Sequence, residues 1–301
     1  MKQIILGTDW WTDCDDAVAV RLLTRFAKAG RIRFLGVGIN ACMEYSVASL
    51  RGFLTADGMA DVPIGIDRGA LDYGGTPCYQ KPFAERMQLA CTNDDAEDAV
   101  RLYRRLLAES DGGVEIVEIG FLQVIVGVLQ SPPDDLSDKC GLDLVREKVA
   151  KIWVMAGKWD GDGEKEHNFS LNPFTRRAGA DFCALCPVPV TFLGWEVGYG
   201  VITGRHLDAD DPLRTLMYDH GSKNGRHSWD PMLTLLALIG DEAEAGYGTV
   251  RGWASVDADT GANHFRVDPE GRHCYVTRRE SARYYEERID RLLSENGMVD
   301  F

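Results

Sequence analysis

The sequence predicts one α/β domain over residues 1–301, with a mostly parallel, Rossmann-like open sheet flanked by helices and a C-terminal hairpin and helix. Three observations support this fold class. Short β-branched runs alternate with helical patterns along most of the chain. Hydrophobic residues make up 45% of the 301 residues, enough for a sizeable core. The chain shows no internal repeat, low-complexity tract or linker that would divide it.

The first half of the chain alternates between the two element types. Strands are expected at residues 3–8, 33–39, 62–66 and 114–119, and helices at residues 16–29, 45–56, 95–109 and 122–130. The first strand carries Ile4-Ile5-Leu6, and the helix after it ends at Gly30. Pro132-Pro133 stops the fourth helix, because proline cannot continue a helix.

The second half completes the sheet and then changes character. Strands at 151–156 and 188–194 belong to the main sheet, and residues 212–218 and 231–239 are expected to be helical. Residues 250–256 and 264–267 alternate around Asp259-Thr260-Gly261, which predicts a hairpin, and 279–296 reads as a charged helix. Ligands of open α/β sheets bind beyond the carboxyl ends of the strands. The residues that follow the strands are therefore the candidates for function.

Composition excludes two classes of partner. The net charge of −14 and the sequence pI of 4.9 argue against a nucleic-acid binder, which needs basic surface. No apolar run approaches the ~18 residues of a membrane span, and the N-terminal run is too short for a signal peptide. Eight scattered cysteines suit a reducing, cytoplasmic location. The pair Cys183 and Cys186 has the spacing of a metal or redox motif, with two core thiols as the alternative.

An acidic cluster follows the first strand. Asp9, Asp13, Asp15 and Asp16 place four carboxylates in eight positions. Helix capping by Asp13 or Asp15 explains one or two of them, and capping alone remains the alternative interpretation. Two like charges about 4 Å apart repel by roughly 1 kcal/mol in water and about 4 kcal/mol at an effective dielectric of 20. Such crowding favours a hard divalent cation, calcium or magnesium.

Several segments in chain order resemble the inosine-uridine-preferring nucleoside hydrolases. The pattern Asp-x-x-x-Asp-x-Asp-Asp-Ala after a strand is similar to the N-terminal motif of that family, in a form with a longer loop. The further matches are Asn40, Gly120-Phe121-Leu122-Gln123-Val124, Met155-Ala156-Gly157, Glu166-His167-Asn168-Phe169 with Asn172-Pro173, and Trp229-Asp230-Pro231. The match covers residues from about 3 to 240, and the common order of the motifs carries it.

The resemblance implies a calcium-dependent hydrolase that splits the N-glycosidic bond of a ribonucleoside into ribose and free base. It implies that calcium is held by Asp9, Asp16, Asp230 and the main-chain carbonyl of Gln123, and that Asp9 takes the proton of the attacking water. The residues implied to bind ribose hydroxyls are Asp15, Asn40, Glu166 and Asn168. The partner would be a small-molecule ribonucleoside, and the assembly a homodimer or homotetramer.

The chain also departs from the family pattern. Gly7 stands in place of the usual first aspartate, Trp10-Trp11 in place of Pro-Gly, and Gln123-Val124 in place of Thr-Asn. Trp229 occupies the position of the histidine that serves the family as leaving-group acid, while His227 is two residues out of register. Trp229 would stack on a flat base. Core packing is the alternative for all three tryptophans, and the role of Asp13 stays open.

Other functions remain in competition. A ribose- or nucleoside-binding protein on the same fold, catalytically weak, would share every binding feature. A haloacid-dehalogenase-type phosphatase would need an aspartate nucleophile where the chain has Gly7. The individual residues also have simpler interpretations: Asp230 before Pro231 suits a helix N-cap, Asn40 suits a turn, and Glu166 with Asn168 suits a polar loop.

Overall fold

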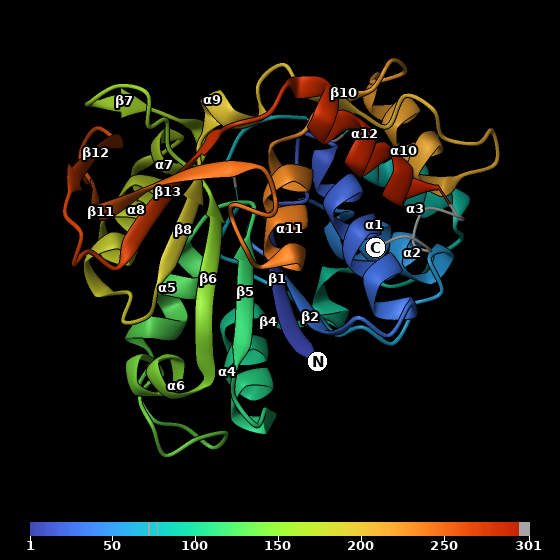
Figure 1. The fold of residues 1–301 in the computed structure, drawn as a ribbon. Coiled ribbons are helices and arrows are strands. Elements are labelled where there is room, and N and C mark those ends of the chain that lie inside the picture. Colours follow the sequence, from blue (N-terminus) through green and yellow to red (C-terminus); the bar gives the residue numbers. More distant parts are fainter. Residues whose placement is uncertain (72, 77, 295–301) are drawn as a thin grey trace.

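The computed structural model describes residues 1–71, 73–76 and 78–294 (Figure 1). Within these residues, eleven strands form one sheet in the order β4-β3-β2-β1-β5-β6-β8-β13-β11-β12-β7. The strands are β1 (Lys2–Thr8), β2 (Ile32–Ile39), β3 (Ile64–Ile66), β4 (Glu97–Asp98), β5 (Val114–Glu118), β6 (Val149–Met155), β7 (Glu164–Lys165), β8 (Val190–Leu193), β11 (Tyr247–Val256), β12 (Ala262–Val267) and β13 (His273–Arg278). A separate two-stranded sheet pairs β9 (Ile202–Thr203) with β10 (Arg226–His227).

The direction of pairing confirms the predicted open, mostly parallel sheet. Every neighbouring pair from β4 across to β13 is parallel, and only β11, β12 and β7 add antiparallel pairs. The predicted hairpin is present as β11 and β12, with Val256 opposite Asn263. It extends the main sheet, because β13, which the sequence reading missed, pairs with both β8 and β11.

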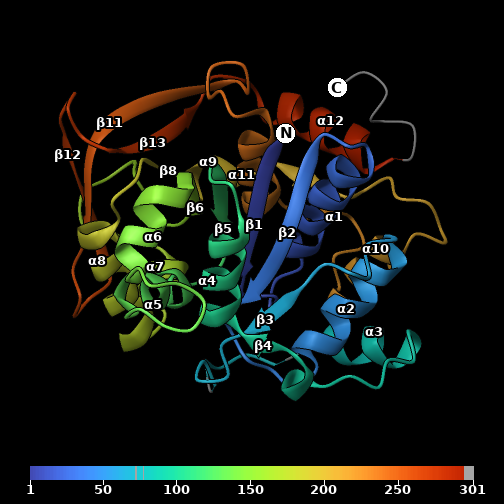
Figure 2. The ribbon, with the colours of Figure 1, turned by 90° about the horizontal axis from the view of Figure 1, so that it is seen from below.

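Helices cover both faces of the sheet (Figure 2). One face packs against α4, α5, α6 and α8, and the other against α1, α2, α11 and α12. The helices are α1 (Asp15–Lys28), α2 (Ser46–Ala56), α3 (Gln80–Arg86), α4 (Ala99–Glu109), α5 (Gln123–Gln130), α6 (Gly141–Lys148), α7 (His167–Ser170), α8 (Pro173–Leu185), α9 (Trp195–Gly198), α10 (Pro212–His220), α11 (Trp229–Ile239) and α12 (Ala282–Leu293). Across residues 1–71, 73–76 and 78–294, each helix is too short or too polar to span a membrane.

Strand β1 is apolar on both sides because both sides are covered. Ile5 belongs to the core under α4 and α5, whereas Ile4 and Leu6 belong to the core under α1 and α11. All three side chains have no exposed surface. A parallel strand that is buried on both faces loses the alternating pattern and reads as a continuous hydrophobic run. That run places the end of β1 deep in the molecule.

Three predicted helix starts differ from the observed ones, for local reasons. The helix predicted from residue 95 begins at Ala99, because the side chain of Asp98 caps it by accepting a hydrogen bond from the Arg101 amide at 2.9 Å. The helix predicted from residue 231 begins at Trp229, so Asp230 lies in its first turn and is not the N-cap. The C-terminal helix predicted from residue 279 is α12, which begins at Ala282 because the side chain of Ser281 caps it by accepting a hydrogen bond from the Tyr284 amide. Residues 295 and 296 of that prediction lie outside the described residues.

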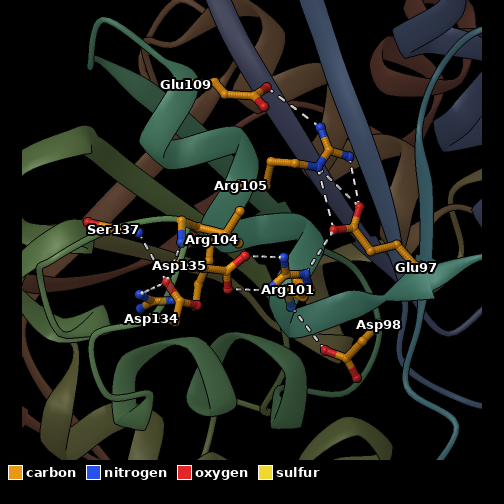
Figure 3. A network of polar contacts seen from close by, with 10 residues as sticks. Glu97, Asp98, Arg101, Arg104, Arg105, Glu109, Asp134, Asp135 and Ser137 are labelled. Carbon is orange, nitrogen blue, oxygen red and sulfur yellow. Dashed lines mark hydrogen bonds and ion pairs between the residues drawn. The ribbon is translucent and has the colours of Figure 1, made fainter.

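A network of arginines and carboxylates joins α4 to its surroundings (Figure 3). Arg104 is buried and donates from Nε and Nη2 to Asp134, at 2.7 and 2.8 Å. Arg101 donates from Nη1 and Nη2 to the two carboxylate oxygens of Asp135, at 2.7 and 2.6 Å. These bidentate bonds fix the loop after α5 against α4, since a guanidinium fork matches the geometry of a carboxylate.

Gly7 leaves room for a carboxyl group that comes from the neighbouring strand. Gly7 lies opposite Glu118 of β5, and a Cβ on Gly7 would collide with Oε2 of Glu118. The Glu118 side chain is fully buried and its Oε1 accepts a hydrogen bond from the Tyr103 hydroxyl at 3.2 Å. Burial raises the pKa of Glu118 to about 8, although the bond from Tyr103 opposes the rise. A side chain at position 7 would therefore occupy the space that the Glu118 carboxyl group fills.

We expect Glu118→Gln to remove a pH-dependent loss of stability. The folded pKa of Glu118 lies above its unfolded value, so its neutral form stabilises the fold below about pH 4.5 and this stabilisation is lost as the pH rises through about 8. Wild type should lose stability relative to the variant over that window, with a slope no steeper than about 1.4 kcal/mol per pH unit. Denaturant unfolding of both proteins from pH 5 to 9 measures the difference, with Glu270→Gln on the surface as control. If the free energies of unfolding of wild type and Glu118→Gln changed in parallel with pH, the claim that Glu118 is buried as a neutral carboxyl group would be wrong.

Candidate functional site

The ends of three neighbouring strands meet around Asp9. The Asn40 amide, just after β2, donates to the Thr8 carbonyl at 2.9 Å. The Phe121 amide, after β5, donates to Oδ1 of Asn40 at 2.9 Å. Gly120 lies so close that a Cβ there would collide with the backbone nitrogen of Asp9. The carboxyl edge of the sheet therefore brings Asp9, Asn40 and the start of α5 together.

The loop after Asp9 makes a strained turn at Trp10. Trp10 has φ of 44°, in the left-handed region that bulky residues avoid. Its amide donates to Thr8 Oγ1 at 3.1 Å and to Asp16 Oδ1 at 3.3 Å, and its indole Nε1 donates to Ser49 Oγ at 2.8 Å. The buried indole lies in the core, as the packing interpretation expects. Its contacts hold the turn that brings the carboxylate of Asp16 back to the end of β1.

Three buried carboxylates converge beyond β1. Asp15 and Asp16 open α1, Asp230 lies in the first turn of α11, and one ligand oxygen from each lies within 4.8 Å of the others. The Asp230 amide donates to Asp15 Oδ2 at 3.1 Å, and the Thr8 hydroxyl donates to Asp16. The N-cap of α1 is Cys14, with no side-chain capping bond. Capping alone therefore does not account for the cluster.

The carboxyl groups of the cluster resist ionisation. Burial raises the pKa of Asp15, Asp16 and Asp230, and also that of Asp9, which lies outside this group of three. The neighbouring carboxylates raise each of these pKa values further. The repulsion is relieved in one of two ways: protonation makes a carboxyl group neutral, or a divalent cation stabilises the charged carboxylates. An all-oxygen donor set suits a hard cation such as calcium or magnesium. The arrangement fits a divalent metal.

Asp13 forms an ion pair with an arginine. Arg226 donates to it from Nε at 2.8 Å and from Nη2 at 2.6 Å. Asp13, Cys14 and His220 also bring ligand atoms within 4.8 Å of one another. The buried Cys14 thiol has a raised pKa, because burial and then Asp13 disfavour the thiolate. The Asp13 carboxylate of this second group is already paired with an arginine.

Two polar side chains at the strand ends keep unused hydrogen-bonding atoms. Nδ2 of Asn40 and Oε1 of Gln123 are buried and have no partner among residues 1–71, 73–76 and 78–294. The Gln123 side chain donates to the Asn40 carbonyl, so the two residues contact each other. A buried polar atom without a partner costs about 1–3 kcal/mol, so such atoms mark a place for a ligand or water. Asn40 thus does more than satisfy a turn. The main-chain carbonyl of Gln123 as a metal ligand stays a prediction.

Glu166 and Asn168 lie beyond β6. Glu166 caps α7 by accepting from the Asn168 amide at 3.0 Å, and it also accepts from the Gly157 amide at 2.9 Å. Asn168 donates from Nδ2 to the Met155 carbonyl at 2.8 Å. Burial raises the pKa of Glu166 to about 7, against these backbone bonds. Both side chains fix local backbone, as the polar-loop interpretation expects, and their binding of hydroxyls stays a prediction.

Trp229 belongs to an aromatic group near the surface. Its indole Nε1 donates to the Trp195 carbonyl at 2.8 Å, and its ring lies 5.2 Å from that of His227. His227 in turn stacks on Tyr199 at 4.8 Å. Trp195 and Tyr199 are 36% and 51% exposed, which sets the group apart from the fully buried Trp10. The sequence reading missed Trp195 and Tyr199, although both follow a strand of the main sheet, where ligands bind.

The comparisons with known proteins identify the fold. No protein-family model and no curated protein matches the chain. Similar solved structures include the inosine-uridine preferring nucleoside hydrolase from Bacillus anthracis, with 14% identity, a TM-score of 0.68 and coverage of 97% of this chain and 99% of that chain. The purine-preferring ribonucleoside hydrolase from Gardnerella vaginalis has 17% identity, a TM-score of 0.71 and coverage of 97% and 99%. The type III effector XopQ, complexed with adenosine diphosphate ribose, has 17% identity, a TM-score of 0.67 and coverage of 99% and 94%. The chain has the fold of the nucleoside hydrolases.

We expect Asp230→Asn to stabilise the protein without metal and to abolish stabilisation by a divalent cation, with calcium as the cation to be tested. The amide removes one negative charge from a crowded, buried cluster. In EDTA at about pH 8 the melting temperature should rise by roughly 2–4 °C, the shift for about 1 kcal/mol in a chain of this size. Thermal melts in EDTA and in calcium measure both effects, with Asp111→Asn on the surface as control. A lower melting temperature in EDTA together with an intact calcium effect would refute the role of Asp230.

Proposed function

We propose that the protein hydrolyses the N-glycosidic bond of a ribonucleoside or related N-riboside, giving ribose and free base, with calcium as cofactor. One observation carries the proposal: buried carboxylates from two helix starts converge at the carboxyl edge of a sheet that has the nucleoside hydrolase fold. The proposed setting is purine or pyrimidine salvage by a cytoplasmic homodimer or homotetramer.

The proposed calcium ligands are Asp9, Asp16, Asp230 and the main-chain carbonyl of Gln123. When bound there, calcium would supply positive charge, which lowers the pKa of a nearby water molecule and attracts the ribose hydroxyls. The donor set supports this choice, because these oxygen ligands suit a hard cation. The mutual rise in carboxyl pKa supports it too, since a cation would relieve the repulsion.

Asp9 is the proposed general base. It lies directly after β1 and is only partly buried, so a water molecule can reach it. Its carboxylate lies at the carboxyl edge of the sheet, where a positioned side chain can accept a proton from an attacking water molecule. The transition state would resemble an oxocarbenium ion, whose positive charge the nearby carboxylates stabilise.

The remaining proposed contacts hold the sugar and the base. Asp15 would accept from the 2′-hydroxyl, and the unused Nδ2 of Asn40 would donate to the sugar. Glu166 and Asn168 complete the ribose site in this proposal. Trp229 takes the place of the leaving-group acid and would stack on the base, and its aromatic neighbours support that assignment.

A binding protein without efficient turnover is the second candidate. The XopQ structure was solved with adenosine diphosphate ribose, so that neighbour of the fold binds a ribosylated ligand. Incubation with a panel of nucleosides and calcium, followed by an assay for free ribose, separates the two. Ribose release that EDTA abolishes supports the hydrolase, whereas calorimetric binding of a nucleoside without release supports the binding protein.

We expect Asp9→Asn to abolish hydrolysis with little loss of stability. The amide cannot accept the proton of the water, and a general base contributes 10²–10⁴-fold, roughly. Initial rates of ribose release and a thermal melt test this pair of effects. A variant that keeps more than about a tenth of the wild-type rate would be incompatible with a base of that size.

We expect Trp229→Ala to impair natural nucleosides more than p-nitrophenyl riboside. The nitrophenolate leaves without protonation, so that substrate reports on the ribose and metal half of the site. Loss of a base–aromatic stack should cost about 1–3 kcal/mol. The comparison is kcat/KM on the two substrates beside a thermal melt. Equal losses with a lowered melting temperature would assign Trp229 to packing.

A further inference from the structure

An ion pair links the acidic loop after β1, which contains Asp13, to the segment of β10 that precedes Asp230. Arg226, in β10, donates from Nε and Nη2 to the two oxygens of Asp13, at 2.8 and 2.6 Å. The same Asp13 accepts from the Cys14 amide at 2.7 Å, immediately before Asp15. The Arg226 guanidinium also lies 5.9 Å from the centre of the Trp229 ring, next to Asp230. One ion pair thus joins both parts of the carboxylate cluster.

Other contacts fix the loop backbone beside this ion pair. His220 bonds through Nε2 to the Thr12 carbonyl at 2.9 Å, and through Nδ1 to Ser222 Oγ at 2.8 Å. Gln80 donates to the Trp10 carbonyl at 3.0 Å. Among the loop carboxylates, Asp13 pairs with Arg226, whereas Asp15 and Asp16 join Asp230 in the buried trio.

Arg226 could act through its charge or through its geometry. Asp13 raises the pKa of the cluster carboxyl groups, and Arg226 lowers the pKa of Asp15. The charges of the ion pair therefore act on the carboxylates of the cluster. The side chains of Arg226 and Asp13 are 35% and 29% exposed, however, so solvent screens the charge. The bidentate fork fixes both the distance and the direction of Asp13. Geometry is therefore the stronger effect.

We propose that Arg226 is a positioning residue, whose bidentate bond to Asp13 sets the acidic loop so that its carboxylates meet Asp230 around the cation. The inference rests on the proposed function, because it assigns Arg226 a role toward the proposed calcium. It predicts that the two members of the pair act as one unit. Removing either should loosen the loop by the same amount, and removing the second should add nothing.

The test is calorimetric titration of calcium into wild type, Arg226→Ala, Asp13→Ala and the double variant. Both single variants should bind calcium about tenfold more weakly, as expected for partners that orient metal ligands, and the double variant no more weakly than either. Arg226→Lys keeps the charge but not the fork, so it should resemble Arg226→Ala. Arg86→Ala breaks another bidentate Arg–Asp pair, with Asp219, and should leave calcium affinity unchanged.

Each other outcome has a defined meaning. A purely electrostatic role makes Arg226→Ala bind calcium more tightly and Asp13→Ala more weakly, with additive effects, and would overturn the inference. Unchanged affinity in both single variants, or rescue by Arg226→Lys, would overturn it as well. A wild type that binds no calcium would overturn the proposed function together with the inference, so the two failures are distinguishable. Circular dichroism and thermal melts in EDTA establish that each variant is folded before titration.

Discussion

The repulsion among buried carboxylates is the constraint around which this molecule is organised. Asp15, Asp16 and Asp230 bring oxygens within 4.8 Å of one another in a region that excludes most water. A pair of like charges at about 4 Å costs roughly 4 kcal/mol at an effective dielectric of 20. A fold of ordinary stability, about 5–15 kcal/mol, tolerates this arrangement only with compensation. Protonation, helix dipoles and a bound cation are the available means.

The fold provides part of that compensation. Asp15 and Asp16 lie in the first turn of α1, and Asp230 lies in the first turn of α11, where helix dipoles favour negative charge. Helices α1 and α11 pack against each other, so the positive N-terminal ends of both helix dipoles lie at the carboxylate cluster. The left-handed turn at Trp10 costs of order 1–3 kcal/mol and is held by core contacts. Strain and negative charge are thus concentrated in one region, where a cation would offset the charge.

The sequence predicted the sheet better than the details around the site. Alternating buried runs and helical patterns were enough for a parallel sheet, and the aspartates after β1 pointed to its carboxyl edge. Strand β13 was missed because its residues carry little apolar periodicity. The N-cap alternative for Asp230 was suggested by the Pro231 that follows it, but Ser228 is the N-cap of α11. The pairing of Asp13 with Arg226 joins residues 213 positions apart, which no local pattern reveals. Glu118 beside Gly7 is likewise a contact between strands, not neighbours in sequence.

A calcium-bound crystal structure tests the central claim most directly. The account predicts an anomalous scattering peak within about 2.3–2.6 Å of carboxylate oxygens of Asp9, Asp16 and Asp230 and of the Gln123 carbonyl oxygen, the range for calcium ligands. Asp15 should remain outside that set, bonded to the Asp230 amide and open to a sugar hydroxyl. Crystals grown in calcium that show no ion among these carboxylates, or an ion held by Asp13, Cys14 and His220 instead, would contradict the account.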